Sequence, residues 1–146
     1  MWILGAVVIV LLAAYFAKIT SEDTQSPASG TQAPATQEGD PMMVGTWSST
    51  DDAKFTREFK ADGTIVDRYE GDDSATVTGT WMVVDPSKEP VELLGTPAEN
   101  LGGMTIIKTT WPNGLIMYFG LSSLTEIDLK LIYVGRGNTL SFKKVQ

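Results

Sequence analysis

The residue types that carry most enzyme chemistry are partly missing from this sequence. Its 146 residues include no histidine and no cysteine. These two absences exclude a Ser-His-Asp or Cys-His nucleophile, a zinc site built from His or Cys, haem or iron–sulfur ligation, and a disulfide. Carboxylates, cationic side chains, hydroxyls and aromatic rings remain. We expect no cofactor and no catalytic residues of the common kinds.

Carboxylates are the groups left for acid–base chemistry. Glu126 and Asp128 lie two apart on a predicted strand and therefore share one face. Ile127 and Leu129 are expected to point inward, which places the two acids in solvent. Glycosidases instead hold two carboxylates across a cleft in unlike environments. A carboxylate-based hydrolase is kept as an alternative function that needs two converging acids.

Two further acidic pairs, Asp51-Asp52 and Asp72-Asp73, lie in predicted loops. Neither has the Asp-x-Asp-x-Asp-Gly spacing that surrounds a calcium ion with oxygens. We expect solvated turn residues there and no metal site. The net charge of −7 and the pI of about 4.4, without a basic cluster, also argue against a nucleic-acid partner.

The most informative polar pair is Arg57 and Asp67. Ala61-Asp62-Gly63 is typical of a three-residue hairpin loop, and pairing Lys60 with Thr64 across it fixes the register. Arg57 then lies opposite Asp67 on the apolar face, where a charge is costly unless it is paired.

Two interpretations of this pair remain open. It is either an internal salt bridge that fixes strand register, or part of a ligand site in which Arg57 engages a carboxylate. Tyr69 and Tyr133 are expected to line the same interior, so the candidate ligand-binding residues are Arg57, Asp67, Tyr69 and Tyr133. Trp111, beside a proline in a loop, is the tryptophan that fits an exposed binding aromatic.

The residue pattern predicts short strands, and these strands position the residues named above. From Met42 onward, apolar and polar residues alternate and a turn signal recurs every eight to twelve residues. The eight predicted strands are 44–49, 54–60, 64–70, 75–84, 104–109, 115–121, 126–134 and 139–145.

Eight sequential antiparallel strands favour an all-β, up-and-down barrel, because closure removes unpaired edges. A two-sheet sandwich is the alternative. Residues 85–103 are expected to form a long loop with at most a short strand at 91–94, and no helix is expected after residue 42.

The N-terminal segment has a different composition. Residues 2–19 are apolar apart from Lys18, and they extend about 27 Å as a helix, close to the thickness of a thin bilayer. Nothing basic precedes the run, and bulky residues stand where a signal peptidase needs small ones. We expect a single transmembrane anchor that contacts the lipid bilayer. A cleaved signal or a buried helix is the alternative.

Residues 20–41 contain no aromatic residue and no aliphatic side chain larger than alanine. This composition predicts a disordered linker with a reach of about 26 Å. Its Ser, Thr and Pro content is typical of stalks that hold a domain outside the cytoplasm. Lys18 favours the opposite orientation by the positive-inside rule.

Three short motifs in residues 42–146 resemble those of a known family. Gly45-Thr46-Trp47 opens the first predicted strand, Phe59 to Thr64 reads Phe-x-x-Asp-Gly-Thr, and Gly-Thr-Trp recurs at residues 79–81. This pattern is similar to that of small bacterial lipocalin-like (calycin-type) barrels, in which the first Trp plugs the closed end. The chain departs from full-length lipocalins in lacking a C-terminal helix and cysteines.

The resemblance implies a non-catalytic role. Such a domain binds a small apolar or amphipathic ligand, or meets another envelope protein through its surface. Together with the predicted anchor and linker, it predicts a membrane-tethered, extracytoplasmic binding or interaction module. A purely structural envelope protein is a further alternative.

Overall fold

The computed structural model describes residues 39–146. The predicted anchor, residues 2–19, lies outside the described residues, as does most of the predicted linker at 20–41. Within residues 39–146, no helix is long and apolar enough to cross a membrane.

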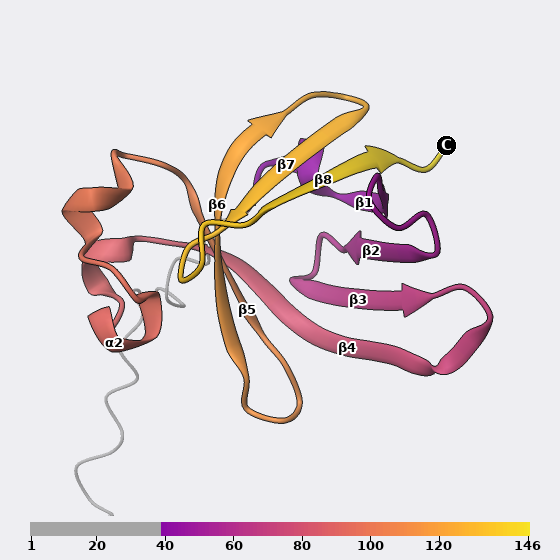
Figure 1. The fold of residues 1–146 in the computed structure, drawn as a ribbon, viewed down its shortest axis with the longest axis horizontal. Coiled ribbons are helices and arrows are strands. Elements are labelled where there is room, and N and C mark those ends of the chain that lie inside the picture. The colour runs from indigo at the N-terminus through magenta and orange to yellow at the C-terminus, as the bar shows by residue number, and fades with distance from the viewer. Residues whose placement is uncertain (1–38) are drawn as a thin grey trace, which may run out of the picture. The chain divides into compact units, whose positions relative to one another are not determined.

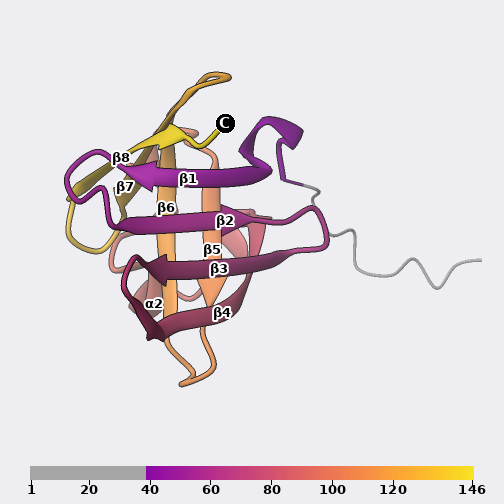
Figure 2. The ribbon, with the colours of Figure 1, turned by 90° about the vertical axis from the view of Figure 1, so that its right-hand side faces the viewer.

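The described chain forms a closed barrel of eight antiparallel strands. Each strand pairs with the next one in sequence, and β1 pairs with β8 to close the sheet (Figure 1). In Figure 2, β1 to β4 lie one above another, while β5 and β6 cross behind them. The strands are β1 (Gly45–Ser49), β2 (Phe55–Phe59), β3 (Thr64–Tyr69), β4 (Asp72–Val84), β5 (Ile106–Thr110), β6 (Ile116–Leu124), β7 (Asp128–Tyr133) and β8 (Thr139–Lys144). The all-β fold and the closed barrel are confirmed, and the two-sheet sandwich is wrong.

The β2–β3 hairpin has the predicted register. The Lys60 N–H donates to the Thr64 carbonyl at 2.9 Å, and Gly63 has a φ of 84° that favours glycine. The Asp62 carboxylate accepts from the Thr64 N–H at 2.9 Å, which stabilises the turn and lowers the pKa of Asp62. The same register continues from Phe59 with Ile65 to Phe55 with Tyr69 and includes the predicted pair of Arg57 with Asp67.

One end of the barrel is filled by large side chains. Before β1, the short 3-10 helix η1 (Pro41–Met43) brings the buried Met43 over the end of the core. The Trp47 indole N–H donates to the Met43 carbonyl at 2.8 Å, and that of Trp81 donates to the Lys60 carbonyl at 2.9 Å. The loops at residues 50–54, 70–71, 111–115 and 134–138 therefore gather at the opposite end of this antiparallel barrel.

The β4–β5 connection contains helical turns, so the expectation of no helix after residue 42 is wrong. These are η2 (Pro86–Lys88), α2 (Val91–Leu94) and η3 (Ala98–Leu101). The possible strand at 91–94 is therefore also wrong. Pro90 precedes α2, and Gly95 ends it with a φ of 75°. Leu94 packs on Ile106 and Tyr118 in a second cluster, separate from the main core.

Ile127 is also placed differently from the prediction. Residues 125–127 form the turn between β6 and β7, and Ile127 is 54% exposed. The inward alternation starts only at Leu129, which is fully buried. A turn interrupts strand alternation, which explains the error.

Leu94 tests whether the helical connection is a stabilising part of the fold. Leu94→Ala removes a buried side chain, and we expect a loss of about 2–4 kcal/mol in the free energy of unfolding. Leu93→Ala is the matched control, since Leu93 in the same turn is 50% exposed and its loss is expected to change stability by about 0.5 kcal/mol or less. Urea unfolding measures both. Equal effects would contradict the packing described.

Candidate ligand site at the open end of the barrel

The predicted ion pair is present inside the barrel. Arg57 Nε donates to Asp67 Oδ1 and Arg57 Nη2 to Asp67 Oδ2, both at 2.7 Å, which is a bidentate pair. Arg57 is only 5% exposed. The strand register places Trp47, Arg57, Asp67 and Val77 in one row across β1 to β4. The inward placement of Arg57 and Asp67 is thus confirmed.

Three aromatic rings surround the guanidinium group. Arg57 Cζ lies 5.3 Å from the ring centre of Phe119, 5.6 Å from that of Phe55 and 5.8 Å from that of Trp111. These distances fall within the range of cation–π attraction. The faces of these rings attract the buried cation, but they accept no conventional hydrogen bond.

Trp111 reaches this position from the β5–β6 turn. The backbone N–H of Trp111 donates to the Leu115 carbonyl at 2.9 Å, so residues 112–114 form a three-residue loop like that of β2–β3. The indole packs against Gly79, where an added Cβ would lie 2.9 Å from Trp111 Cε3. Trp111 is 7% exposed. The prediction of an exposed aromatic is wrong, because the inward alternation of β5 continues to residue 111.

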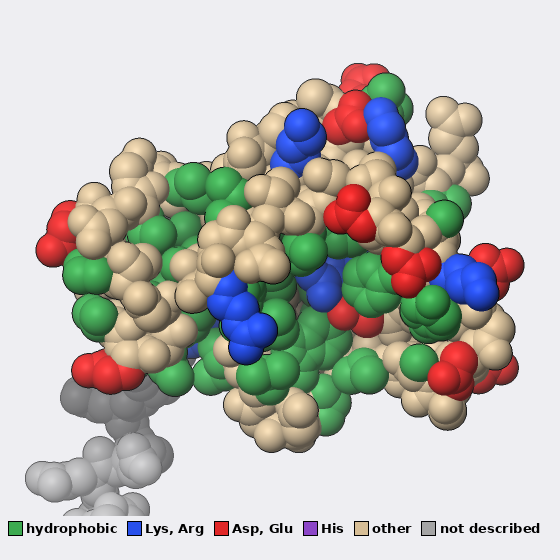
Figure 3. Space-filling view, in the orientation of Figure 1, with side chains coloured by type: hydrophobic (Ala, Val, Ile, Leu, Met, Phe, Trp, Pro, Cys, Tyr) green, Lys and Arg blue, Asp and Glu red, His purple; other side chains and the backbone are tan. Residues whose placement is uncertain are grey.

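A cavity of about 610 Å³ opens beside the ion pair. Its wall is mainly apolar, and Figure 3 shows hydrophobic side chains gathered over the central part of one face. The lining residues are Phe55, Arg57, Asp67, Ala75, Val77, Trp111, Pro112, Asn113, Leu115 and Met117.

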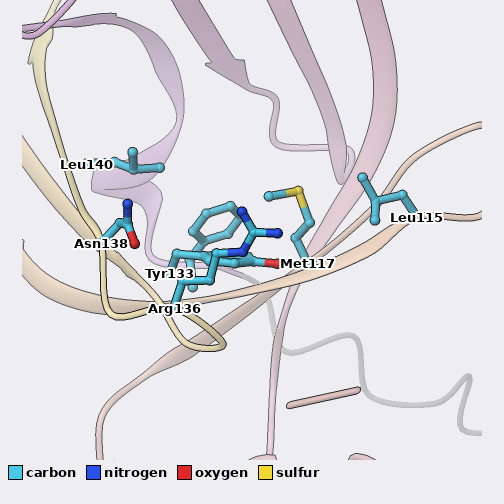
Figure 4. Close-up of a pocket in the computed structure, with 7 residues that line it drawn as sticks. Leu115, Met117, Tyr133, Arg136, Asn138 and Leu140 are labelled. Atoms are coloured by element: carbon cyan, nitrogen blue, oxygen red, sulfur yellow. The ribbon is translucent and has the colours of Figure 1, made fainter. Parts of the chain in front are cut away.

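A second cavity, of about 330 Å³, shares Leu115 and Met117 with the first. Figure 4 shows Met117 between Leu115 and Tyr133, with Arg136 beside the tyrosine ring. Arg136 Cζ lies 5.9 Å from the centre of that ring. Tyr133 thus lines a cavity as predicted, although a different one from Arg57. The two cavities form adjacent parts of the open end.

Tyr69 lies apart from both cavities. It is 38% exposed and borders a separate pocket of about 430 Å³ together with Lys54, Thr56 and Arg68. The neighbouring Asp52 carboxylate raises the pKa of Tyr69. The β3–β4 register shifts between Asp67 and Tyr69. The expectation that Tyr69 lines the interior beside Arg57 is therefore wrong.

Two buried side-chain nitrogens lack a hydrogen-bond partner within residues 39–146. They are Arg57 Nη1 and Trp111 Nε1, both from residues that line the larger cavity. A buried donor without an acceptor costs about 1–3 kcal/mol. Both donors thus belong to residues that border one cavity, and the described residues offer neither of them an acceptor.

The acids of the described chain give no support to a paired-carboxylate active site. Four of them are partly buried, and each is paired with a cation rather than with a second acid. The pairs are Asp67 with Arg57, Glu58 with Arg68, Glu89 with Lys108, and Asp128 with Lys143. Asp51, Asp52, Asp72 and Asp73 are exposed, the last two at the start of β4 rather than in a loop.

A second polar cluster lies in the connection that packs on β5 and β6. Glu89 accepts from Lys108 Nζ at 2.8 Å and from the Tyr118 hydroxyl at 2.5 Å. Burial raises the pKa of Glu89, but these two hydrogen bonds outweigh it and the net pKa is lowered. Burial, with the neighbouring carboxylate, raises the pKa of Tyr118. A charged Glu89 that accepts hydrogen bonds from Lys108 and from a neutral Tyr118 holds the β4–β5 connection against the barrel. Sequence reasoning missed this cluster because no local pattern joins residues 89, 108 and 118.

No family model, curated protein or solved structure matches this chain.

A double-mutant cycle measures how far the ion pair holds the barrel together. We expect Arg57→Met and Asp67→Leu each to lower the free energy of unfolding by about 3–5 kcal/mol, because each leaves one buried partner uncompensated. The double variant is expected to lose less than the sum of the two.

The outer pair of the same hairpin is the control. Arg68 and Glu58 are also ten residues apart and 2.8 Å from each other, but they are more exposed. Arg68→Met is expected to cost under about 1 kcal/mol. Strict additivity of the Arg57 and Asp67 variants in urea unfolding would contradict the coupling.

Proposed function

We propose that this chain is a membrane-tethered, extracytoplasmic, lipocalin-like binding module without catalytic activity. Its ligand is a small apolar or amphipathic molecule that enters the open end of the barrel. The observation that carries this proposal is the cavity of about 610 Å³ whose apolar wall ends on a buried, incompletely bonded guanidinium group.

The composition of the cavity supports a binding role. Ligand pockets are typically about 300–1,000 Å³, mostly apolar, with a few placed polar groups. Here the apolar wall includes Phe55, Val77, Leu115 and Met117. The lining residues with polar side-chain atoms are Arg57, Asp67, Trp111 and Asn113. Apolar walls favour transfer of a ligand from water, and the few polar atoms select among ligands.

The location proposed for the barrel rests on the sequence before it. Residues 2–19 have the composition of a membrane anchor, and residues 20–41 have that of a polar stalk. A tether of this kind keeps a binding domain near the membrane, where amphipathic molecules concentrate.

The binding part is tested by native mass spectrometry of the full chain released from membranes of its own host. We expect a bound small molecule on the wild type and its loss in Leu115→Asp, which places a charge in the apolar wall. Leu93→Asp is the matched control, because Leu93 and Leu115 are 50% and 49% exposed and Leu93 borders neither cavity. If Leu115→Asp retains the same bound molecule, this cavity is not the binding site. If the wild-type protein carries no bound molecule, the binding role is refuted.

The location is tested separately on intact cells. A protease added outside is expected to remove the barrel domain while a cytoplasmic marker stays whole. Protection of the barrel until the cells are lysed would place it in the cytoplasm and refute this part of the proposal.

A further inference from the structure

We infer that the cavity selects an uncharged ligand that presents a carbonyl, or a similar neutral acceptor, to Arg57 Nη1 and Trp111 Nε1. The apolar body of that ligand lies toward the mouth. This inference rests on the proposed function and specifies its ligand class.

The two residues that carry these donors are neighbours. Arg57 Cζ lies 5.8 Å from the Trp111 ring centre, and both residues line the same cavity. The exposed fractions of Arg57 and Trp111 are 5% and 7%, and neither nitrogen finds an acceptor among the described residues. An acceptor on a ligand satisfies donors that the protein leaves unbonded.

The charge of the site favours a neutral acceptor over a carboxylate. Asp67 already takes two hydrogen bonds from Arg57, so the pair is neutral as a whole. The lining contains no second cationic side chain. A bound carboxylate would lie near Asp67 without a counterion of its own, and burying such a charge is costly. The net charge of −4 on residues 42–146 adds to this penalty.

The order of residues along the barrel sets the orientation of the ligand. In the strand register Arg57 lies opposite Trp47, whose side chain is fully buried in the core. The lining residues Pro112, Asn113 and Leu115 belong instead to the turn at the open end. The acceptor group of the ligand therefore lies at the inner end of the cavity, and its apolar part lies nearer the mouth.

Reaching the two covered nitrogens requires a wall side chain to move. Met117 lines both cavities, and its unbranched chain has three rotatable bonds. It is therefore the side chain proposed to move when the ligand head enters.

The test compares octanamide, methyl octanoate and octanoate, which share an acyl chain and differ in charge at the head. The full chain is held in lipid nanodiscs near neutral pH, and empty nanodiscs correct for partition into lipid. We expect a dissociation constant at least tenfold lower for octanamide than for octanoate. Nuclear magnetic resonance of the ¹⁵N-labelled protein is expected to show the Trp111 indole N–H shifting on binding of both neutral probes.

Two variants separate hydrogen bonding from shape. Trp111→Phe keeps an aromatic ring but loses the donor, and it is expected to weaken octanamide binding about three- to tenfold. Trp81→Phe is the control, since the Trp81 indole already donates to Lys60 and lies outside both cavities. It is expected to leave octanamide affinity unchanged.

Asp67→Asn tests the charge argument directly. It leaves Arg57 without a counterion, so octanoate is expected to bind this variant more tightly than octanamide does. The indole resonances of Trp47 and Trp81 report whether the variant keeps its fold. If the variant does not fold, the comparison of the three probes on the wild-type protein tests the inference by itself.

Octanoate binding the wild type as tightly as octanamide would overturn the inference and leave the proposed function standing. Octanamide binding without a shift of the Trp111 indole N–H would do the same. If none of the probes perturbs any residue of the cavity, the proposed function fails together with the inference.

Discussion

A guanidinium group inside a β-barrel is the constraint on which much of this structure depends. Arg57 is almost fully buried, and a buried cation is tolerated only where charge and hydrogen bonds compensate the loss of water. Compensation here needs Asp67 directly opposite on β3, which a one-residue slip would turn to the other face. The three-residue loop at 61–63 and the ion pair therefore specify the same register independently.

The surroundings of Arg57 impose further conditions on distant parts of the chain. Trp111 reaches the guanidinium because β5 keeps its alternation to the last paired residue and because Gly79 leaves room for the indole. A side chain at residue 79 would meet the carbonyl of Thr110 as well as the ring. The surroundings of this one charge are thus built by residues from β2, β3, β4 and β6 and from the turn after β5.

Local rules explain how much of this could be predicted from the sequence. Strand alternation and the Asp-Gly turn are short-range signals, and they placed all eight strands and the Arg57–Asp67 pair. Trp111 could have been predicted by the same rule, since Asn113-Gly114 repeats the turn chemistry of Asp62-Gly63. The Asn113 side chain accepts from the Leu115 N–H at 3.0 Å, as Asp62 does from Thr64.

What the sequence could not supply depends on contacts between distant residues. The helical turns of residues 86–101 are too short for a periodic signal, and Leu94 is buried only because Ile106 and Tyr118 lie beneath it. Tyr69 pairs with Phe55 as predicted. Its side chain nevertheless lies at the rim of the barrel, where the register between β3 and β4 shifts. The cavity itself is a property of the closed barrel and has no local pattern.

The arrangement that stabilises Arg57 also leaves part of its hydrogen-bonding capacity unused. A guanidinium group has five N–H bonds, and a single carboxylate in bidentate contact takes two of them. The other three neighbours, Phe55, Trp111 and Phe119, offer ring faces that attract the cation without accepting conventional hydrogen bonds. The charge is therefore balanced while hydrogen-bonding capacity remains. Such an arrangement gives no advantage to a second negative charge, because Asp67 already balances the guanidinium group.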